Sequence, residues 1–394
     1  MVRAGPRGLR GLLFSDLGQV VLTFLVVKAA LYAYAYVAWV WVPADERARP
    51  FRPLLDWPWL GIWQQWDAGA YIGIAERGYQ PGNADLTVFF PLMGWLMAGM
   101  RLLVGNTFLA GVIIANLAML GAVLLLYRLA LLETGSTAAA HRAAFYLLIF
   151  PSSFFTSTAY SEALFLLTTI GCFYAWRRGR WLVAGWAGMA AQLTRFLGIV
   201  LALVLAVAYV AHLRTRGWRP DRGILAPLLV LAGLGVYALI LQLQMGDPLA
   251  PYTQRAGFDE RTVPPWVSLA TAWDTVQGRN LHPDFPENWA RNLINLASVL
   301  LFLGLTAVAF WRLGAVYGLY MLLTLLLALS DSQLGDRALA GMVRFNLALF
   351  PGFILLGQWG ARPAVDRLIT VGFLLFLGLL TPFFLRGWSV AGVN

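Results

Sequence analysis

Long apolar runs recur along almost the whole chain, and they constrain its fold more than any other feature. The first run begins at Leu17 and the last ends at Leu385. Several reach about 20 residues, the length that an α-helix needs to cross the hydrocarbon core of a bilayer. Only 12% of the 394 residues are charged, against about 25% in a typical soluble protein, which leaves too little polar surface for a water-soluble particle. The sequence therefore predicts an all-α integral membrane protein.

Polar and basic segments divide the apolar sequence into twelve runs. They cover residues 17–42, 89–104, 108–126, 141–156, 161–176, 181–192, 196–212, 224–243, 293–311, 315–329, 345–358 and 368–385. The run at 89–104 is short and has Pro91 near its start. If it crossed fully, the loop that carries Arg128 and Arg142 would lie outside, so we interpret it as a partial helix. This leaves about eleven crossings in one polytopic membrane domain, residues 1–394.

Basic residues gather in short clusters between the runs, as expected for cytoplasmic loops. The clusters are Arg3, Arg7 and Arg10; Arg177, Arg178 and Arg180; and Arg214, Arg216, Arg219 and Arg222. They assign the N-terminus to the cytoplasm and the C-terminus, a first loop at 43–85 and a second loop at 244–288 to the external side. The net charge of +10 is spread over these clusters, whereas a nucleic-acid-binding protein would gather its charge on one soluble surface.

Candidate functional residues fall on the predicted external side. They are Trp66, Asp67, Tyr71, Tyr160, Glu162, Gln192, Arg195, Asp247, Trp266 and Arg344. Apolar residues recur at helical spacing through 66–79, which predicts a short juxtamembrane helix with one face on the membrane surface. Asp67 then has two interpretations, an N-terminal helix cap or a functional carboxylate just above the bilayer. Glu162 has the same two, as an acid that complements a helix dipole or as a functional group.

Arg195 and Arg344 lie at the external ends of apolar segments. Such arginines often extend to the headgroups, but a guanidinium also binds a lipid phosphate bidentately. Other chemistry lacks a signal. The three histidines are scattered, which suggests no zinc site, and the sequence has neither a phosphate-binding loop nor a dense carboxylate cluster. The single cysteine, Cys172, rules out an intramolecular disulfide.

Several motifs, taken in order, resemble the PIG-V mannosyltransferases, which belong to the GT-C class. They are Trp66-Asp67 with Tyr71 and Gly78-Tyr79, Phe89-Phe90-Pro91-Leu92, Phe150-Pro151-Ser152-Ser153, Tyr160-Ser161-Glu162, Leu193-Thr194-Arg195, Gly246-Asp247-Pro248, Pro265-Trp266 and Arg344-Phe345. The resemblance runs from about Trp66 to Pro351. The chain departs from many relatives at Ala70, where a histidine or bulky aromatic is common, and at Phe196, where proline is common.

The resemblance implies a GT-C-like bundle of about eleven helices with a long first external loop. It implies an enzyme that transfers mannose, with inversion, from a polyprenyl-phosphate carrier to a glycan, lipid or protein acceptor at the external face. Asp67 would be the general base, Arg195 or Arg344 the phosphate partner, and Glu162 with Tyr160 contacts to the sugar or acceptor. Trp66, Tyr71, Gln192, Asp247 and Trp266 complete the expected substrate-binding set. Membrane lipids are the other expected partner. No cofactor and no metal-ligand residues are expected, and the sequence carries no signal for or against a metal requirement.

Two alternatives stay open at this stage. A transporter or flippase of a lipid-linked sugar would share the apolar groove and the charged outer site, but would not need a carboxylate beside a hydroxyl. The absence of an internal repeat weighs against it, because many transporters are built from repeated halves. A GT-C transferase that uses a pentose is the nearer alternative. The sequence carries no signal for the oligomeric state.

Overall fold

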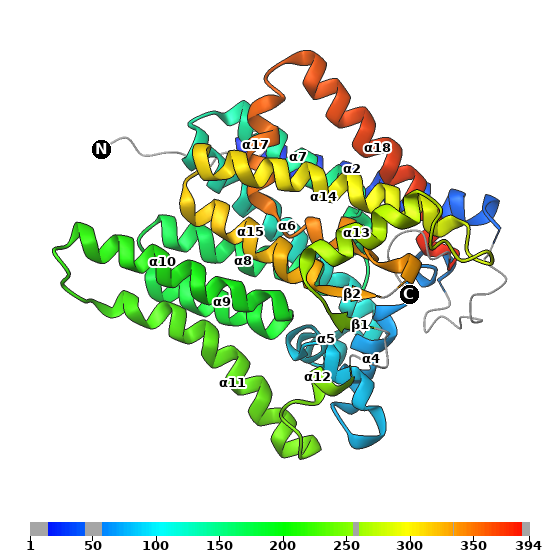
Figure 1. Cartoon of the computed structure of the whole chain (residues 1–394), viewed down its shortest axis with the longest axis horizontal. Coiled ribbons are helices and arrows are strands. Elements are labelled where there is room, and N and C mark those ends of the chain that lie inside the picture. Colours follow the sequence, from blue (N-terminus) through cyan, green and yellow to red (C-terminus); the bar gives the residue numbers. More distant parts are fainter. Residues whose placement is uncertain (1–14, 44–56, 255–259, 334, 388–394) are drawn as a thin grey trace.

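A computed structural model describes residues 15–43, 57–254, 260–333 and 335–387 (Figure 1). Outside this part lie the predicted basic cluster at Arg3, Arg7 and Arg10, residues 44–56 and 255–259 of the two loops predicted to be external, and the last seven residues. The described chain is an assembly of helices with a small two-stranded sheet, which confirms the all-α membrane fold predicted from the sequence.

The described residues form the following elements in chain order. They are α2 (Asp16–Trp41), α3 (Pro58–Gly61), α4 (Asp67–Arg77), η1 (Pro81–Val88), α5 (Pro91–Val104), α6 (Thr107–Thr134), α7 (Thr137–Ile149), η2 (Ser153–Ser157), α8 (Glu162–Arg177), α9 (Trp181–Thr194), η3 (Phe196–Ile199), α10 (Val200–Thr215), η4 (Arg222–Ile224), α11 (Leu225–Met245), α12 (Ala250–Gln254), β1 (Glu260–Thr262), α13 (Pro265–Val276), α14 (Glu287–Arg312), α15 (Ala315–Ser330), β2 (Asp331–Gln333), η6 (Gly335–Arg337), α16 (Met342–Asn346), α17 (Phe350–Trp359) and α18 (Pro363–Leu385).

Six helical segments of the described chain are long and apolar enough to cross a membrane, or up to eight if each of two bent pairs counts as one span. The prediction of about eleven crossings is therefore not confirmed. Several predicted runs form shorter helices: α7 has 13 residues, α9 has 14, and α8 and α15 have 16 each. The run at 89–104 forms the 14-residue helix α5, which bends by 111° from η1, as suits a partial helix.

Small residues let the central helices approach closely, as is common between helices in membranes. The helix α9 packs against both α8 and α11, and α6 lies against α8. A Cβ atom added at Gly185 of α9 would come within 2.8 Å of the Cα atom of Ala226 in α11. A Cβ atom at Gly357 of α17 would come within 2.4 Å of the carbonyl oxygen of Ala139 in α7. At these glycine positions the backbones of neighbouring helices are in direct contact.

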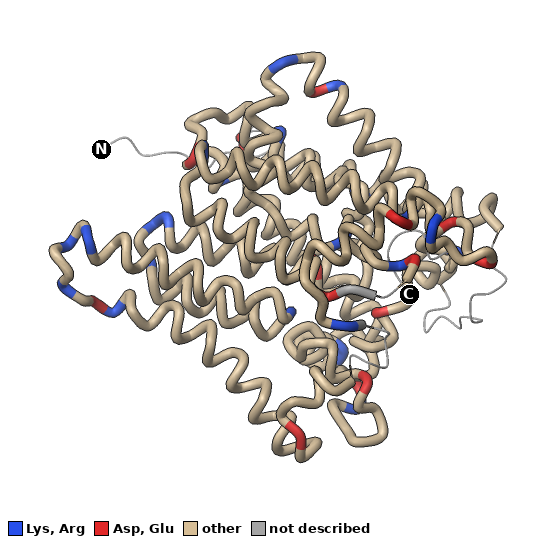
Figure 2. Tube along the Cα trace, viewed as in Figure 1, with Lys and Arg blue, Asp and Glu red and all other residues tan. Residues whose placement is uncertain are grey.

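The helices α8, α9 and α10 have chemically different ends. One end, which we call the basic end, consists of the turns that carry Arg177 to Arg180 and Arg214 to Arg222 (Figure 2). The other end, the site end, carries Glu162 at the start of α8 and Arg195 just after α9. The 16 residues of α8 separate the two ends by about 24 Å at 1.5 Å per residue.

The predicted juxtamembrane helix is present as α4, but its apolar face is not on the membrane surface. Ala68, Ile72 and Tyr79 are buried in the protein. The helix packs against α5 so closely that a Cβ atom at Gly94 would lie 2.4 Å from the Cγ2 atom of Ile74. Because the bundle covers this face, α4 is held rigidly, and its first residue, Asp67, has a fixed position.

Candidate active site

A strained turn places Asp67 at the start of α4. Trp66 has φ 49° and ψ −118°, a conformation typical of glycine in a type II′ turn. The turn is closed by a hydrogen bond from the Ala68 N–H to the Gln65 carbonyl, 3.1 Å long. Such a backbone conformation costs about 1–3 kcal/mol in a non-glycine residue, and strain of this kind is concentrated at functional sites.

Tyr160 fixes this turn from the neighbouring segment. Its hydroxyl donates to the carbonyl oxygen of Gln65 at 3.1 Å and accepts from the backbone N–H of Asp67 at 3.2 Å. Tyr160 is fully buried. Its ring therefore joins the segment before α8 to the first turn of α4, and brings the start of one helix next to the start of the other.

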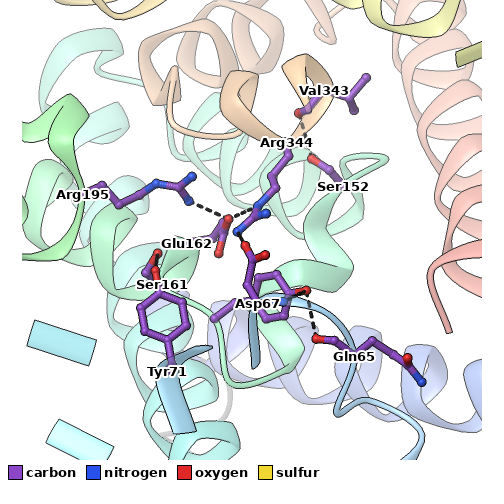
Figure 3. Close-up of polar contacts among 10 residues, drawn as sticks. Gln65, Asp67, Tyr71, Ser152, Ser161, Glu162, Arg195, Val343 and Arg344 are labelled. Atoms are coloured by element: carbon purple, nitrogen blue, oxygen red, sulfur yellow. Dashed lines mark hydrogen bonds and ion pairs between the residues drawn. The ribbon is translucent and has the colours of Figure 1, made fainter. Parts of the chain in front are cut away.

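The side chain of Asp67 faces Arg344 and not the backbone of its own helix. Arg344 Nη2 lies 2.6 Å from Asp67 Oδ2 (Figure 3). The capping position of α4 belongs to Trp66, and no side chain of the described residues caps the helix there. The interpretation of Asp67 as an N-terminal cap thus finds no support in the structure. Its side chain is 21% exposed, so its carboxylate is open to a ligand.

Glu162 is the most buried charged group of the site. Its side chain is 3% exposed, and its Oε1 atom accepts a hydrogen bond from Arg195 Nη1 at 2.5 Å and another from Arg344 Nε (Figure 3). The Oε2 atom is buried without a hydrogen-bond partner in the described part of the chain. One carboxylate oxygen thus joins two arginines that lie 149 positions apart in the sequence (344 − 195).

Aromatic rings hold both arginines. The Cζ atom of Arg344 lies 4.8 Å from the ring centres of Phe155 and of Tyr160, and the Cζ atom of Arg195 lies 5.3 Å from that of Phe345. Cation–π contacts of this length are attractive and limit the movement of the guanidinium. The two arginines and the carboxylates of Asp67 and Glu162 form a cluster whose formal charges cancel.

The backbone around Arg195 depends on a nearby glycine. Arg195 has an extended conformation at the end of α9, where its N–H still donates to the carbonyl oxygen of Ala191 at 3.0 Å. The chain then turns back so tightly that a Cβ atom at Gly198 would lie 2.5 Å from the backbone of Gln192. Only glycine fits there, and the break that results points Arg195 out of the helix and toward Glu162.

Tyr71 supports the cluster from α4. Its hydroxyl donates to Ser161 Oγ at 2.7 Å, one residue before Glu162. Burial raises the pKa of Tyr71 to about 12, and the nearby Arg195 only partly offsets this effect. The hydroxyl therefore stays protonated at physiological pH and acts as a donor. With Tyr160, it forms a second tie between α4 and the start of α8.

A cavity of about 810 Å³ opens beside this cluster. Five of the residues predicted from the sequence line it, namely Trp66, Asp67, Tyr71, Arg195 and Arg344. The remaining wall is largely apolar and aromatic, and includes Leu86, Val88, Phe89, Phe90, Phe196, Leu197, Leu327, Ala328 and Phe345. A carboxylate, two guanidinium groups and an aromatic wall therefore meet in one space.

The other predicted residues do not line this cavity. Tyr160 and Glu162 lie behind its wall, where they hold Asp67 and the arginines. Gln192 is fully buried in α9, and its amide group has no hydrogen-bond partner within the described chain. Asp247 accepts from the Leu249 N–H at 2.9 Å in the turn after α11, and Trp266 is 70% exposed on α13. Their expected contacts with a substrate stay predictions.

Several cavity residues had no signal in the sequence. Tyr252, Thr262 and Asp331 line the cavity together with Asp85. Thr262 and Asp331 face each other in the antiparallel pair β1–β2, which joins the segment between α12 and α13 to the end of α15. Two three-residue strands give no detectable periodicity, and their partners are 69 positions apart (331 − 262). Within the described residues, no group of three or more His, Cys, Asp or Glu side chains could hold a metal ion.

Comparison with solved structures identifies the fold as that of the GT-C membrane glycosyltransferases. ArnT from Cupriavidus metallidurans bound to undecaprenyl phosphate aligns over 96% of this chain and 77% of its own, with 14% identity and a TM-score of 0.52. The Archaeoglobus fulgidus oligosaccharyltransferase in the apo form aligns over 94% of this chain, with 14% identity and a TM-score of 0.42. This chain covers only 56% of that archaeal protein.

The family comparison is more specific. The model of the mannosyltransferases described as PIG-V matches residues 58–217. This segment contains Asp67, Glu162 and Arg195, whereas Arg344 lies beyond it. The resemblance of the chain to the PIG-V mannosyltransferases is thereby confirmed. No curated protein matches the chain.

Proposed function

We propose that this protein is a glycosyltransferase that moves mannose from a polyprenyl-phosphate carrier to an acceptor hydroxyl, with inversion and with Asp67 as the general base. The observation that carries the proposal is the meeting of the Asp67 carboxylate with the Arg195 and Arg344 guanidinium groups at one cavity. A carboxylate can accept the proton of an attacking hydroxyl, and fixed guanidinium groups can stabilise a leaving phosphate. The match to the PIG-V mannosyltransferases supports the choice of mannose.

The chemistry is a single displacement at the anomeric carbon. The acceptor oxygen forms a bond to this carbon while the bond from the carbon to the phosphate oxygen breaks, and the electron pair of that bond leaves with the phosphate. The acceptor proton moves to Asp67. One carboxylate is enough for this reaction, unlike the pair of carboxylates that a glycosidase needs.

The two arginines would stabilise the negative charge that develops on the leaving phosphate. A phosphodiester donor carries one negative charge, and the polyprenyl phosphate that leaves carries one more. Arg344 contacts Asp67 through Nη2 while its Nε is held by Glu162. A phosphate in the cavity would compete with Asp67 for Nη2, so that binding of the donor frees the base. Arg195 would contact the same phosphate from the opposite side.

The cavity wall suits the rest of the donor. The aromatic side chains of Trp66, Tyr71 and Phe89 offer flat faces of the kind that sugar rings stack on, and the apolar side chains around Phe90 and Phe196 suit the first isoprene units. The similar fold of ArnT has been seen with undecaprenyl phosphate, a ligand of the same chemical class. We place the cavity on the external side, because it lies opposite the basic end and cytoplasmic loops carry the basic residues.

The direct test is transfer of radiolabelled mannose from synthetic polyprenyl-phosphate-mannose by the purified protein in detergent, where transport across a membrane has no meaning. Transfer to a glycan, lipid or peptide acceptor, with inverted anomeric configuration by NMR, is the expected result. A polyprenyl-phosphate-pentose serves as the competing donor, and preference for it would replace mannose. No transfer from any lipid-linked sugar, combined with lipid movement in proteoliposomes, would favour a flippase and overturn the proposal.

A further inference from the structure

Glu162 occupies an unexpected place for a substrate contact. It does not line the large cavity, and its side chain is 3% exposed. Its side chain accepts hydrogen bonds from the two arginines, which both reach its Oε1 atom. Arg195 and Arg344, in contrast, do line the cavity. Glu162 can therefore act on a ligand only without contact, through the position of the guanidinium groups and through its own charge (Figure 3).

The charges of the cluster change during the reaction proposed above. Before transfer, two arginines face two carboxylates, Asp67 and Glu162. After transfer, Asp67 holds the acceptor proton and is neutral, while the lipid phosphate has gained a negative charge. Glu162 is then the one carboxylate left in the cluster. Without it, the two arginines would hold a phosphate dianion with neither of their carboxylate partners charged, although Asp85 and Asp331 still line the cavity. Opposite charges attract strongly at low dielectric, so the product would separate slowly.

We propose that Glu162 is a positioning residue that fixes Arg195 and Arg344 and lowers their attraction for an isoprenoid monophosphate, so that this product can leave. The inference rests on the proposed function. It replaces the expectation that Glu162 contacts the sugar or acceptor. It also explains why a carboxylate is buried where an apolar residue would pack with less desolvation cost.

The isosteric variant Glu162→Gln separates charge from shape. A glutamine can keep a carbonyl oxygen at the position of Oε1, where both arginines donate. Its amide NH₂ group then takes the place of Oε2, which is buried without a hydrogen-bond partner among the described residues. The variant should therefore fold with the arginines close to their present positions. The second variant, Glu162→Asp, keeps the charge and moves it by one methylene group.

The readout is the affinity for undecaprenyl phosphate, a ligand without sugar, measured by tryptophan fluorescence in detergent together with steady-state kinetics. Glu162→Gln should bind undecaprenyl phosphate about tenfold more tightly than the wild type, since a buried anion a few ångströms away has been removed. Its kcat and its KM for the donor should both fall, because product release slows. Glu162→Asp should bind within about twofold of the wild type, but with lower kcat/KM, because the arginines shift.

A matched control tests the same chemical change at the basic end. Glu133 is partly buried, with its side chain 8% exposed, and it accepts hydrogen bonds from Arg177 and from Tyr317. Glu133→Gln removes a carboxylate from an arginine in the same way, but far from the cavity. It should leave the affinity for undecaprenyl phosphate unchanged.

Several results would overturn the inference. Unchanged or weaker binding of undecaprenyl phosphate by folded Glu162→Gln would remove the charge-balancing role, and unchanged turnover by Glu162→Asp would remove the positioning role. If Glu162→Gln does not fold, the test compares the single variant Arg195→Gln with the double variant Glu162→Gln/Arg195→Gln. The double variant removes one positive and one negative charge and so restores the charge balance of the cluster. It should bind about tenfold more tightly than Arg195→Gln alone, and equal binding would contradict the role. If the wild type itself binds no undecaprenyl phosphate, the proposed function fails and the inference fails with it.

Discussion

Within the described chain, Glu133 and Glu162 both have side chains that are less than 10% exposed and accept hydrogen bonds from arginine, but only Glu162 is part of a candidate active site. At the basic end, Glu133 of α6 accepts from Arg177 of α8 and from Tyr317 of α15, and the side chain of Arg177 is 38% exposed. At the site end, Glu162 accepts from two arginines whose side chains are only 16% and 9% exposed. Glu133 links three helices, whereas Glu162 contacts two arginines that line the cavity and is linked through Arg344 to the carboxylate of Asp67.

The difference between the two ends shows which features distinguish a candidate active site from a structural ion pair. A single pair near water contributes about 0–1 kcal/mol to stability and leaves no group free for chemistry. The cluster at the site end holds two cations and two anions whose side chains are 3–21% exposed, and burial of this extent carries a desolvation cost that an exposed structural pair does not have. Its arginines have a further open face toward the cavity. Burial together with an accessible cavity, rather than the residue types alone, distinguishes the two ends.

The largest effect is expected from Asp67→Asn. The variant keeps the shape of the side chain and an oxygen that can accept from Arg344, so the fold should be retained. It removes the base, and transfer should fall by about 10³-fold, within the range for general base catalysis. Labelled-mannose transfer with matched thermal unfolding curves checks this. Transfer at the wild-type level would show that Asp67 has a structural role. The ion pairs at the site end would then be structural, like those at the basic end.

A somewhat smaller loss is expected from Arg344→Gln. This change removes the guanidinium that contacts both Asp67 and Glu162. Loss of one preorganised donor to a developing oxyanion costs about 10²–10³-fold in turnover. Steady-state kinetics in detergent would measure it, with size-exclusion profiles as the control for folding. A variant that folds and turns over normally would show that Arg344 is a structural arginine like Arg177.

The smallest effect on activity is expected from Glu133→Gln. Transfer should stay within about twofold of the wild type, because Glu133 lies at the basic end and does not line the cavity. The free energy of unfolding should fall by no more than about 1 kcal/mol, since the partner Arg177 is more than one-third exposed. A loss of transfer comparable to that of Asp67→Asn would contradict the distinction between the ends.

Much of the fold could be predicted from the sequence, because apolar runs report the membrane directly. The predicted runs at 161–176 and 315–329 correspond to α8 (Glu162–Arg177) and α15 (Ala315–Ser330) within one residue at each end. The predicted run at 141–156 failed at its end. There, Pro151 cannot continue a helix, so α7 stops at Ile149 and the chain passes into η2. Hydropathy alone does not detect such a break.

Individual residues of the site could be predicted from the sequence, but their arrangement in space could not. Motif resemblance pointed to Asp67, Arg195 and Arg344, which all line the cavity. That Glu162 lies behind the arginines follows from contacts between residues 33 and 182 positions apart, for which hydrophobic periodicity carries no information. The cavity wall around Thr262 and Asp331 depends on a strand pair formed between a loop and a helix end. Both features come from tertiary packing alone.

The most direct measurement is a cryo-electron microscopy structure of the wild-type protein with undecaprenyl phosphate. We expect the phosphate in the cavity, within hydrogen-bond distance of Arg195 and Arg344, with Glu162 still on the arginines and the Asp67 carboxylate released from Arg344. The isoprenoid chain should follow the apolar wall near Phe90 and Phe196. A phosphate bound elsewhere, with the pair between Asp67 and Arg344 intact, would contradict the assignment of this cluster as the active site.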